Sequence, residues 1–527
     1  MNPVELIIGL ILAAAVLATI AGRFGIPYPV LLVLGGLVLG FVPGLPDVQF
    51  PPDIAFLVFI TPLVYIAAAQ TTLRDFRSNL RPILILALGL VLANCVLVAT
   101  VTHYGIPNFS WATAFVLAAI IGPTDTVAVN AVTSTTPVPR RVGTILEGES
   151  LINDIVALIA YKMSIDAVTT GKVSYTAAGL HLLWDSTAGI AVGLLVGVSA
   201  AWIRRRLNNP GVSIAASLLT GYAAYLGAEL ISASGILATV TAGFYIGRHL
   251  SKILSSEQRV QAYFFWDSFS FLLEGLAFVL IGLELRVILR DLAEFSTASL
   301  LIDVVLVSAA VILLRLLWVF AFAYLPPHLF KGVNDRQSLP PWKHVFLLGW
   351  AGMRGVDSLA AALALPLMLA DGKTAFPNRN LIVFLSFSVI LSTLVLQGLT
   401  LPLLLRWLDL KDDHLEEIEE AQARIAASAA VLRRLEQYPT SRSITPDILA
   451  QIKAMYERKQ RLARSQLDPD DDGSVVMSIK EMKELRRELL AIERCVVIDQ
   501  RDRGEISDNV LRRIERSLDY EDLQYQE

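Results

Sequence analysis

Long apolar runs separated by short polar breaks make up the sequence as far as residue 408. A transmembrane helix needs about 20 mostly apolar residues, and thirteen runs of roughly this length can be placed, with the letters SAS at 232–234 marking the junction of the eighth and the ninth. The pattern therefore predicts an all-α membrane protein with about thirteen transmembrane helices. The runs lie near residues 4–21, 29–46, 54–72, 82–103, 110–133, 146–168, 181–203, 212–231, 233–250, 263–285, 298–325, 343–370 and 381–407.

Charged residues are concentrated at the carboxyl end of the chain. Of its 527 residues, 54% are apolar and only 17% are charged, whereas soluble proteins average about a quarter charged residues. Charges are sparse up to Arg406 and frequent from Asp409 onward. We therefore predict two domains, a transmembrane domain over residues 1–408 and a helical cytoplasmic domain over residues 409–527.

Helix signals recur within the predicted cytoplasmic domain. Thr445 precedes a proline, as at a helix start, and Ser507 is a second candidate N-cap. The acidic stretch DPDDDG at 468–473 invites a calcium interpretation, but it lacks the EF-hand spacing and the terminal Glu. We interpret it as a loop. The two cysteines lack metal-ligand spacing, and no cofactor is predicted.

Loop charges predict the orientation in the membrane. Cytoplasmic loops of membrane proteins carry an excess of Lys and Arg. Taken alternately, one set of loops holds fifteen basic residues and the other holds five, so the first set is assigned to the cytoplasm. The amino terminus, which lacks a basic region and a cleavage site, is interpreted as the first spanning helix. The prediction is an amino terminus outside and a carboxyl terminus inside. The larger set comprises Arg23, Arg74, Arg77, Arg81, Arg140, Arg141, Arg204, Arg205, Arg206, Arg248, Lys252, Arg259, Lys331, Arg336 and Lys343.

The stretch LEGESLINDIVALIA at residues 146–160 places carboxylates in an apolar run. On a helix, Ser150 and Asp154 form one stripe with Glu147, and Glu149 and Asn153 form the adjoining stripe. Asp154 lies two turns deeper than Glu147. Intramembrane carboxylates are costly and usually functional, so we predict a functional role for Asp154.

Two further runs are interrupted by helix-breaking residues. The first contains GPTD, with Thr124 and Asp125 directly after Gly-Pro, and the second contains GMRGVDS, with Arg354 and Asp357. Proline breaks a helix, and a broken helix at membrane depth is tolerated only where it is buried or lines a wet cavity. Two interrupted helices in corresponding parts of a chain are typical of inverted-repeat transporters. The pattern favours that fold class.

Arg315 is a lone cation in the apolar run VILLRLLWVF. A charge so deep in a run requires an anionic partner or a route to the interface. We predict a buried partner for it, with Glu149 as the candidate.

At these residues the chain resembles the sodium/proton exchanger family, in the branch of the bacterial and archaeal NhaP proteins and the animal NHE exchangers. The resemblance rests on four features in order: GPTD at 122–125, ExxxND at 149–154, the buried Arg315, and GMRGVxSLAAALALP around Arg354. It covers residues 4–407, and RGEISDNVLRRIERSLDYED in the tail looks like the end of bacterial members. The family implies a homodimer in the inner (plasma) membrane, with a dimerisation domain and a mobile core that holds two crossed, interrupted helices.

The resemblance also implies roles for individual residues. Asp154 would bind the transported Na⁺, with ligands from Ser150, Thr124 and Asp125. Asn153 stands where the electrogenic branch has a second Asp. Glu149 and Arg315 would form the structural ion pair of the core, and the charge of Arg354 would offset buried carboxylates.

Two positions depart from the family pattern. Thr126 stands where the family usually has Pro. Asp357 stands where many relatives have an apolar residue, so it either pairs with Arg354 or adds a second titrating group.

A single carboxylate that holds either H⁺ or one monovalent cation predicts electroneutral exchange. Oxygen ligands suit Na⁺ or Li⁺, with K⁺ as the open alternative. The transported ions are the predicted substrates, and pH and sodium homeostasis is the role that follows. A cation channel would need a continuous pore with rings of ligands, and an intramembrane enzyme would need a catalytic pattern at membrane depth; neither pattern is visible in the sequence. A transporter-like sensor with a signalling tail remains a further alternative.

Overall fold

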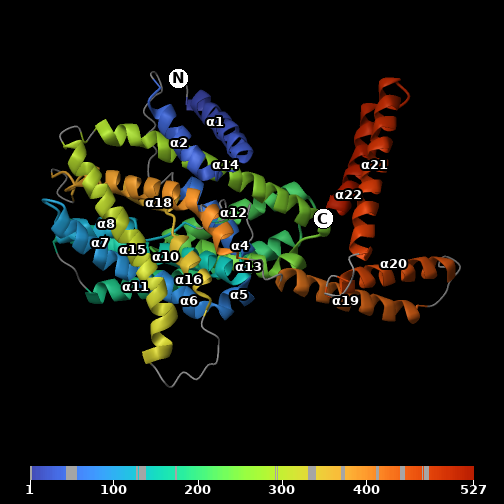
Figure 1. Cartoon of the computed structure of the whole chain (residues 1–527), viewed down its shortest axis with the longest axis horizontal. Helices are drawn as coiled ribbons and strands as arrows, with labels where there is room; N and C mark the ends of the chain where they lie inside the picture. Colours follow the sequence, from blue (N-terminus) through green and yellow to red (C-terminus); the bar gives the residue numbers. More distant parts are fainter. Residues whose placement is uncertain are drawn as a thin grey trace. The chain divides into compact units, whose positions relative to one another are not determined.

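The fold is helical throughout the part of the chain that the structure describes (Figure 1). The computed structural model describes residues 3–42, 56–125, 129, 138–171, 175–290, 292, 295–329, 340–369, 374–410, 415–438, 446–465, 467 and 474–526. Within these ranges, the one departure from helix and loop is an isolated bridge between Met368 and Ala375. The predicted all-α class is confirmed.

The chain divides into two compact units, residues 1–412 and 413–527. The first unit contains α1 Pro3–Phe24, α2 Tyr28–Gly40, the π-helical turn η1 Phe56–Ile60, α4 Thr61–Gln70, α5 Leu73–Ser78, α6 Leu80–Leu84, the π-helical turn η2 Ile85–Leu90, α7 Val91–Gly105, α8 Trp111–Ile120, α10 Arg140–Thr170, α11 Tyr175–Arg204, α12 Pro210–Glu229, α13 Gly235–Ile253, α14 Ser256–Arg290, α15 Thr297–Leu329, α16 Trp342–Trp350, α17 Val356–Leu363 and α18 Arg379–Leu408. The second contains α19 Leu415–Glu436, α20 Pro446–Ser465, α21 Ser474–Asp502 and α22 Asp508–Gln526.

Each of the thirteen apolar runs falls on one or more of these helices. Seven helical segments in the described residues are long and apolar enough to cross a membrane by themselves, and three shorter apolar helices accompany them. Charges lower the hydropathy of α10, and breaks shorten α8, α16 and α17. The protein is therefore a multi-pass membrane protein, while the count of thirteen crossings and the orientation stay predictions. The seven are Glu5–Phe24, Leu80–Gly105, Leu183–Arg204, Pro210–Glu229, Ser256–Glu284, Thr297–Leu325 and Arg379–Leu408.

Helices of the first unit pack closely where glycines remove side chains. A Cβ built on Gly36 of α2 would lie 2.2 Å from the carbonyl oxygen of Val279, and one on Gly282 of α14 would lie 2.2 Å from that of Val33. Only glycine permits this approach, and small residues at membrane helix interfaces allow backbones to meet and gain dispersion energy. The pairing holds α14 against α2.

Local signals account for several helix ends. Ser110 caps α8, because its Oγ accepts a hydrogen bond from the amide of Thr113 at 3.2 Å. The long helix α10 ends at Gly171, whose φ of 66° is the left-handed conformation that favours glycine. Ser507 accepts a bond from the amide of Val510 at 3.4 Å before α22, so the predicted cap is confirmed.

The second unit is a set of helical hairpins, in which α19 packs on α20 and α21 on α22 (Figure 1). Ion pairs join α21 to α22, including Arg486 with Glu521 and Arg494 with Asp519. All four side chains are a third exposed or more, and such pairs contribute about 0–1 kcal/mol each. The predicted cap at Thr445 and the acidic stretch at 468–473 lie outside the described residues.

Candidate functional site

The first broken helix is α8, which ends at Ile120 and is followed by non-helical backbone through Asp125. The break falls on Gly122-Pro123, as the sequence predicts. Thr124 and Asp125 are 7% and 5% exposed, and the amide of Asp125 donates to the carbonyl of Met353 at 2.9 Å. Thr126 lies outside the described residues.

The second broken helix consists of α16 and α17, separated by non-helical residues 351–355. Its break lies against the first one. Nε of Arg354 donates to the carbonyl of Ile121 at 3.2 Å, and the backbone amide of Arg354 donates to Oγ1 of Thr393 on α18 at 3.2 Å. Buried backbone groups need hydrogen-bond partners where water is absent. Here each break supplies some of the hydrogen-bond partners of the other.

Close contact between the breaks depends on Gly355, the residue before α17. A Cβ at Gly355 would lie 1.7 Å from Oδ2 of Asp125, so the carboxylate of Asp125 occupies the space where a side chain would be. A carboxylate at a helix start interacts favourably with the exposed N–H groups and the helix dipole. Asp125 thus contacts the amino-terminal end of α17.

The polar stretch of α10 faces the breaks. Glu149, Ser150, Asn153 and Asp154 are 1%, 7%, 0% and 9% exposed. Asp154 and Asn153 are therefore withdrawn from the surface, in a helix whose next residues are apolar. Glu147, at the other end of the same stripe, is half-buried.

Glu149 pairs with Arg315 of α15, the partner expected from the sequence. Nη1 of Arg315 donates to Oε1 at 2.5 Å and Nη2 donates to Oε2 at 2.9 Å, a bidentate arrangement. The same guanidinium group donates to the carbonyl of Leu348 at 3.0 Å and to that of Ala351 at 3.4 Å. Arg315 therefore joins α10 to the end of α16.

Thr124 is held by two neighbours on α10. Its hydroxyl donates to Oε1 of Glu149 at 3.1 Å. Nδ2 of Asn153 donates to the hydroxyl oxygen of Thr124 at 3.0 Å and to its carbonyl oxygen at 3.3 Å. An aspartate in place of Asn153 would have no N–H to donate, so the amide at this position ties α10 to the first break.

Asp154 and Asp357 line one small cavity of about 30 Å³. Pro123 of the first break and Tyr161 of α10 also line it. Within the described residues, Oδ1 of Asp154 and the hydroxyl of Tyr161 have no hydrogen-bond partner. The space suffices for roughly one or two water-sized particles, and its lining offers oxygen atoms, the ligands that hard cations prefer.

The residues predicted for the ion site thus divide into two groups. Asp154 reaches the cavity, together with Asp357. Thr124, Asp125, Ser150 and Asn153 do not line it; they are buried beside it or form the contacts that fix the breaks. Arg354 bonds to backbone carbonyls, and no ion pair joins it to Asp357 in the described residues. Of the two alternatives for Asp357, the structure favours a second group beside Asp154.

Sequence reasoning missed two polar groups near the site. Tyr161 lies seven residues after Asp154, a spacing that puts both on one helix face. Glu274 of α14 accepts a hydrogen bond from the hydroxyl of Tyr28 at 2.6 Å, and it is near enough to Asp125 for their charges to interact. A glutamate inside the run at 263–285 was a detectable signal, because carboxylates at that depth are rare.

A pair at the start of α10 lies outside the spanning segments. Arg140 donates to Oδ2 of Asp75 from Nε at 3.2 Å and from Nη2 at 2.7 Å. Burial by itself raises the pKa of Asp75, but hydrogen bonds from Thr72 and Arg140 and the charges of Arg140 and Arg74 outweigh it, so the pKa lies below its usual value. This pair fastens α5 to the helix that carries Asp154.

A family-wide sequence pattern described as "sodium/hydrogen exchanger, transmembrane" matches residues 10–407. The chain belongs to the sodium/hydrogen exchanger family. The resemblance predicted from GPTD, ExxxND, Arg315 and the motif at Arg354 is therefore confirmed.

The relatives of this exchanger include proteins of similar length and longer ones. It is 33% identical to an uncharacterized Na⁺/H⁺ exchanger of Mycobacterium tuberculosis, over 98% of this chain and 95% of the relative. It is 34% identical to a sodium, potassium, lithium and rubidium/H⁺ antiporter of Bacillus subtilis, over 76% of this chain and 61% of that one. It is 30% identical to the Na⁺/H⁺ antiporter ApNhaP of Aphanothece halophytica, over 83% and 81%.

The fold of the exchanger is similar to a solved antiporter structure. The sodium/proton antiporter MjNhaP1 from Methanocaldococcus jannaschii superposes with a TM-score of 0.59 at 21% identity, over 77% of this chain and 97% of that one. The likeness concerns the fold.

Proposed function

We propose that this protein is a secondary antiporter that exchanges Na⁺ or Li⁺ for H⁺ across the plasma membrane, with the two ions competing for Asp154. Membership of the sodium/hydrogen exchanger family supports cation/proton antiport, and so do the names of the Bacillus and Aphanothece relatives, which are those of cation/H⁺ antiporters. The observation that carries the site is the buried carboxylate of Asp154, which faces a small cavity at the crossing of two broken helices and whose Oδ1 has no hydrogen-bond partner among the described residues.

In this proposal, H⁺ and the cation replace each other at Asp154 in the small cavity. Burial disfavours the charged form of a carboxylate, so a carboxylate in a site without water binds a proton or a cation. Na⁺ would be held by Asp154, and Thr124, Asp125 and Ser150 would add oxygens. These three residues are buried beside the breaks and do not line the cavity in this structure, so the proposal requires them to move toward Asp154 when the ion binds. Glu149 with Arg315 and the buried Arg354 keep the crossing in place while the core alternately faces each side.

Asp357 bears on the stoichiometry. Two carboxylates that line one small cavity repel each other when both are charged, and they titrate as a pair. We propose that the pair releases one proton for each cation bound, which keeps the exchange at 1:1 and electroneutral. Release of two protons per cation would make the exchange electrogenic.

Potassium is the second candidate substrate. The observation that favours it is the Bacillus subtilis relative, which is named as an antiporter of K⁺ and Rb⁺ as well as of Na⁺ and Li⁺. The same mechanism would then exchange a larger ion.

We further propose that the protein forms a homodimer and that residues 409–527 lie in the cytoplasm.

The test measures dissipation of a preset ΔpH in proteoliposomes on addition of Na⁺, Li⁺ or K⁺. The wild type is compared with Asp154→Asn and Asp357→Asn. Asp267→Asn is the matched control, because Asp267 is an exposed carboxylate on α14. We expect Asp154→Asn to reduce the response to that of empty liposomes, because Asp154 lines the cavity. Asp267→Asn should leave the response unchanged, because Asp267 does not line the cavity.

A clamp of the membrane potential with K⁺ and valinomycin then separates the mechanisms. Electroneutral exchange continues at the same rate under the clamp, whereas a channel or an electrogenic exchanger follows the imposed potential. A full response in Asp154→Asn would overturn the site, and a response to K⁺ equal to that with Na⁺ would change the substrate but not the mechanism.

A further inference from the structure

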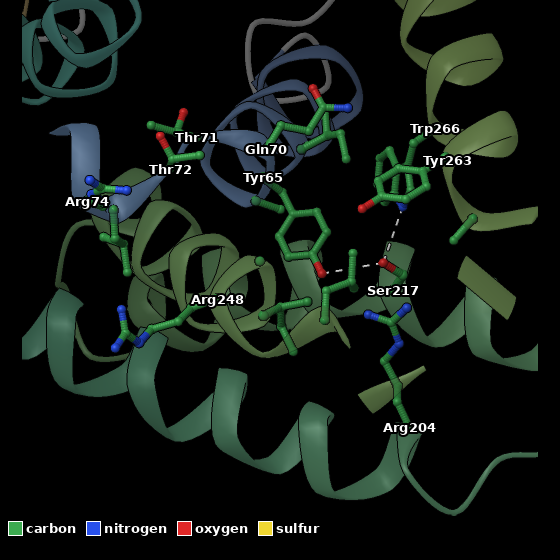
Figure 2. Close-up of a pocket in the computed structure, with 17 residues that line it drawn as sticks. Tyr65, Gln70, Thr71, Thr72, Arg74, Arg204, Ser217, Arg248, Tyr263 and Trp266 are labelled. Carbon is green, nitrogen blue, oxygen red and sulfur yellow. Dashed lines mark hydrogen bonds between the residues drawn. The ribbon is translucent and has the colours of Figure 1, made fainter. Parts of the chain in front are cut away.

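A second pocket, separate from the cavity at Asp154, lies among α4, α5, α11, α12, α13 and α14. Its volume is about 420 Å³. Figure 2 shows Arg74 and Arg248 at one end of this pocket and Arg204 with Ser217 at the other, with Tyr65 between them. We call it the arginine pocket.

Arg204 is the unusual member. It is 1% exposed, and its single hydrogen bond in the described residues runs from Nε to Oγ of Ser213 at 3.4 Å. Its Nη1 has no partner in the described part of the chain, and no described carboxylate forms an ion pair with it. A guanidinium group buried in this way carries a large desolvation cost unless an anion compensates it.

The other two arginines add to the same potential. Arg74 and Arg248 are exposed, so by themselves they are ordinary basic residues at helix ends. Among the described residues that line the pocket there is no aspartate or glutamate. Three cations in this lining repel Na⁺, which argues against the arginine pocket as an entry path for the transported cation.

The remaining lining suits a ligand that is larger than a bare ion. The hydroxyl of Ser217 lies 3.3 Å from that of Tyr65, and it accepts a bond from Nε1 of Trp266 at 3.2 Å. Figure 2 shows these hydrogen bonds, with Tyr263 beside Trp266. The pocket is therefore lined by arginines at both ends and by aromatic and hydroxyl side chains between them.

We propose that the arginine pocket binds an anion that carries a phosphate group. Planar guanidinium groups bond phosphate oxygens in pairs, and the buried Arg204 would gain the partner that its Nη1 lacks. All three arginines belong to the loop set that the charge count assigns to the cytoplasm. The phosphate would therefore come from a phospholipid headgroup of the inner leaflet or from a phosphorylated solute of the cytoplasm. The proposal does not depend on which cation is exchanged.

The experiment measures the midpoint of thermal unfolding of the full-length protein. One arm uses phosphatidylcholine nanodiscs titrated with pyrophosphate as its choline salt, against choline chloride of equal ionic strength. The other arm replaces phosphatidylcholine with increasing fractions of phosphatidylglycerol. The variant is Arg74→Gln with Arg248→Gln. The matched control is Arg77→Gln with Arg205→Gln, which removes two exposed arginines that do not line the pocket.

We expect one arm to raise the unfolding temperature of the wild type. In the pocket variant, the concentration that gives half of this rise should increase about tenfold or more, because charge-assisted hydrogen bonds are lost; the control should match the wild type. Arg204→Gln should also remove the rise. An effect of pyrophosphate supports a soluble phosphate, and an effect of phosphatidylglycerol alone supports a lipid headgroup. No rise in either arm, or an equal rise in both double variants, would overturn the proposal.

Discussion

Arg315 contacts two separate segments of the candidate ion site. Its guanidinium group bonds both carboxylate oxygens of Glu149 on α10 and the carbonyls of Leu348 and Ala351 at the end of α16. Glu149 in turn accepts from Thr124 at the first break. One buried ion pair thus connects α10, which carries Asp154, to the end of α16 and to the first break. Removal of either partner leaves the charge of the other uncompensated.

At the residue scale, we therefore predict that Arg315→Met destabilises the protein by about 3–5 kcal/mol, the usual cost of leaving a buried charge unpaired. The double variant with Glu149→Gln should recover much of this loss, since both charges are then absent. Unfolding temperatures of the purified variants measure the effect. An Arg315→Met protein as stable as the wild type would show that Glu149 has another compensating partner.

At the element scale, the crossing of the two broken helices depends on how closely they approach. The amide of Asp125 meets the carbonyl of Met353, and the side chain of Arg354 meets the carbonyl of Ile121. Gly355 provides the space into which the carboxylate of Asp125 fits. The breaks are thus a single structural unit, although more than two hundred residues separate them in the sequence.

We predict that Gly355→Ala slows exchange about tenfold or more, because the added Cβ displaces Asp125 and shifts the crossing; misplacements of about 1 Å have effects of this size in catalytic sites. Gly143→Ala is the matched control, since a Cβ at Gly143 on α10 meets nothing within 4 Å. It should retain full exchange and gain about 0.5–1 kcal/mol of stability from the lower backbone entropy cost. The same proteoliposome assay compares both. Equal rates in the two variants would contradict the close crossing.

At the scale of the whole molecule, the chain consists of two compact units, and every residue assigned to ion exchange or to the arginine pocket lies in the first. Asp412 ends that unit. The second unit has its own helical hairpins and its own ion pairs. We therefore expect each unit to fold as a separate domain.

We predict that a fragment of residues 1–412 inserts into membranes and exchanges ions with the selectivity of the full chain. Asp154→Asn within it should abolish the response, as in the full-length protein. Residues 413–527 alone should give a soluble, helical protein by circular dichroism. A fragment that inserts and folds but transports nothing would assign the second unit a direct part in exchange.

The sequence by itself determined the class of the protein and the position of its unusual features. The apolar runs predicted the helices, and Gly122-Pro123 and Gly352–Gly355 predicted the breaks. Bilayer thickness, the missing backbone donor of proline and the conformational freedom of glycine all act through neighbouring residues alone. Even one distant contact, Glu149 with Arg315, was predictable, since a buried charge requires an opposite one and few candidates exist. Glu274 was overlooked although the same rule applied to it.

The other contacts between distant residues were decided only by the tertiary structure. It brought Asp357 into the cavity of Asp154, added Tyr161, and turned the amide of Asn153 toward Thr124. It also buried Arg204, which in the sequence is one of three successive arginines at the end of an apolar run. The physical reason is that hydropathy and helix breaking depend on local sequence, whereas a cavity depends on the packing of segments that lie far apart along the chain.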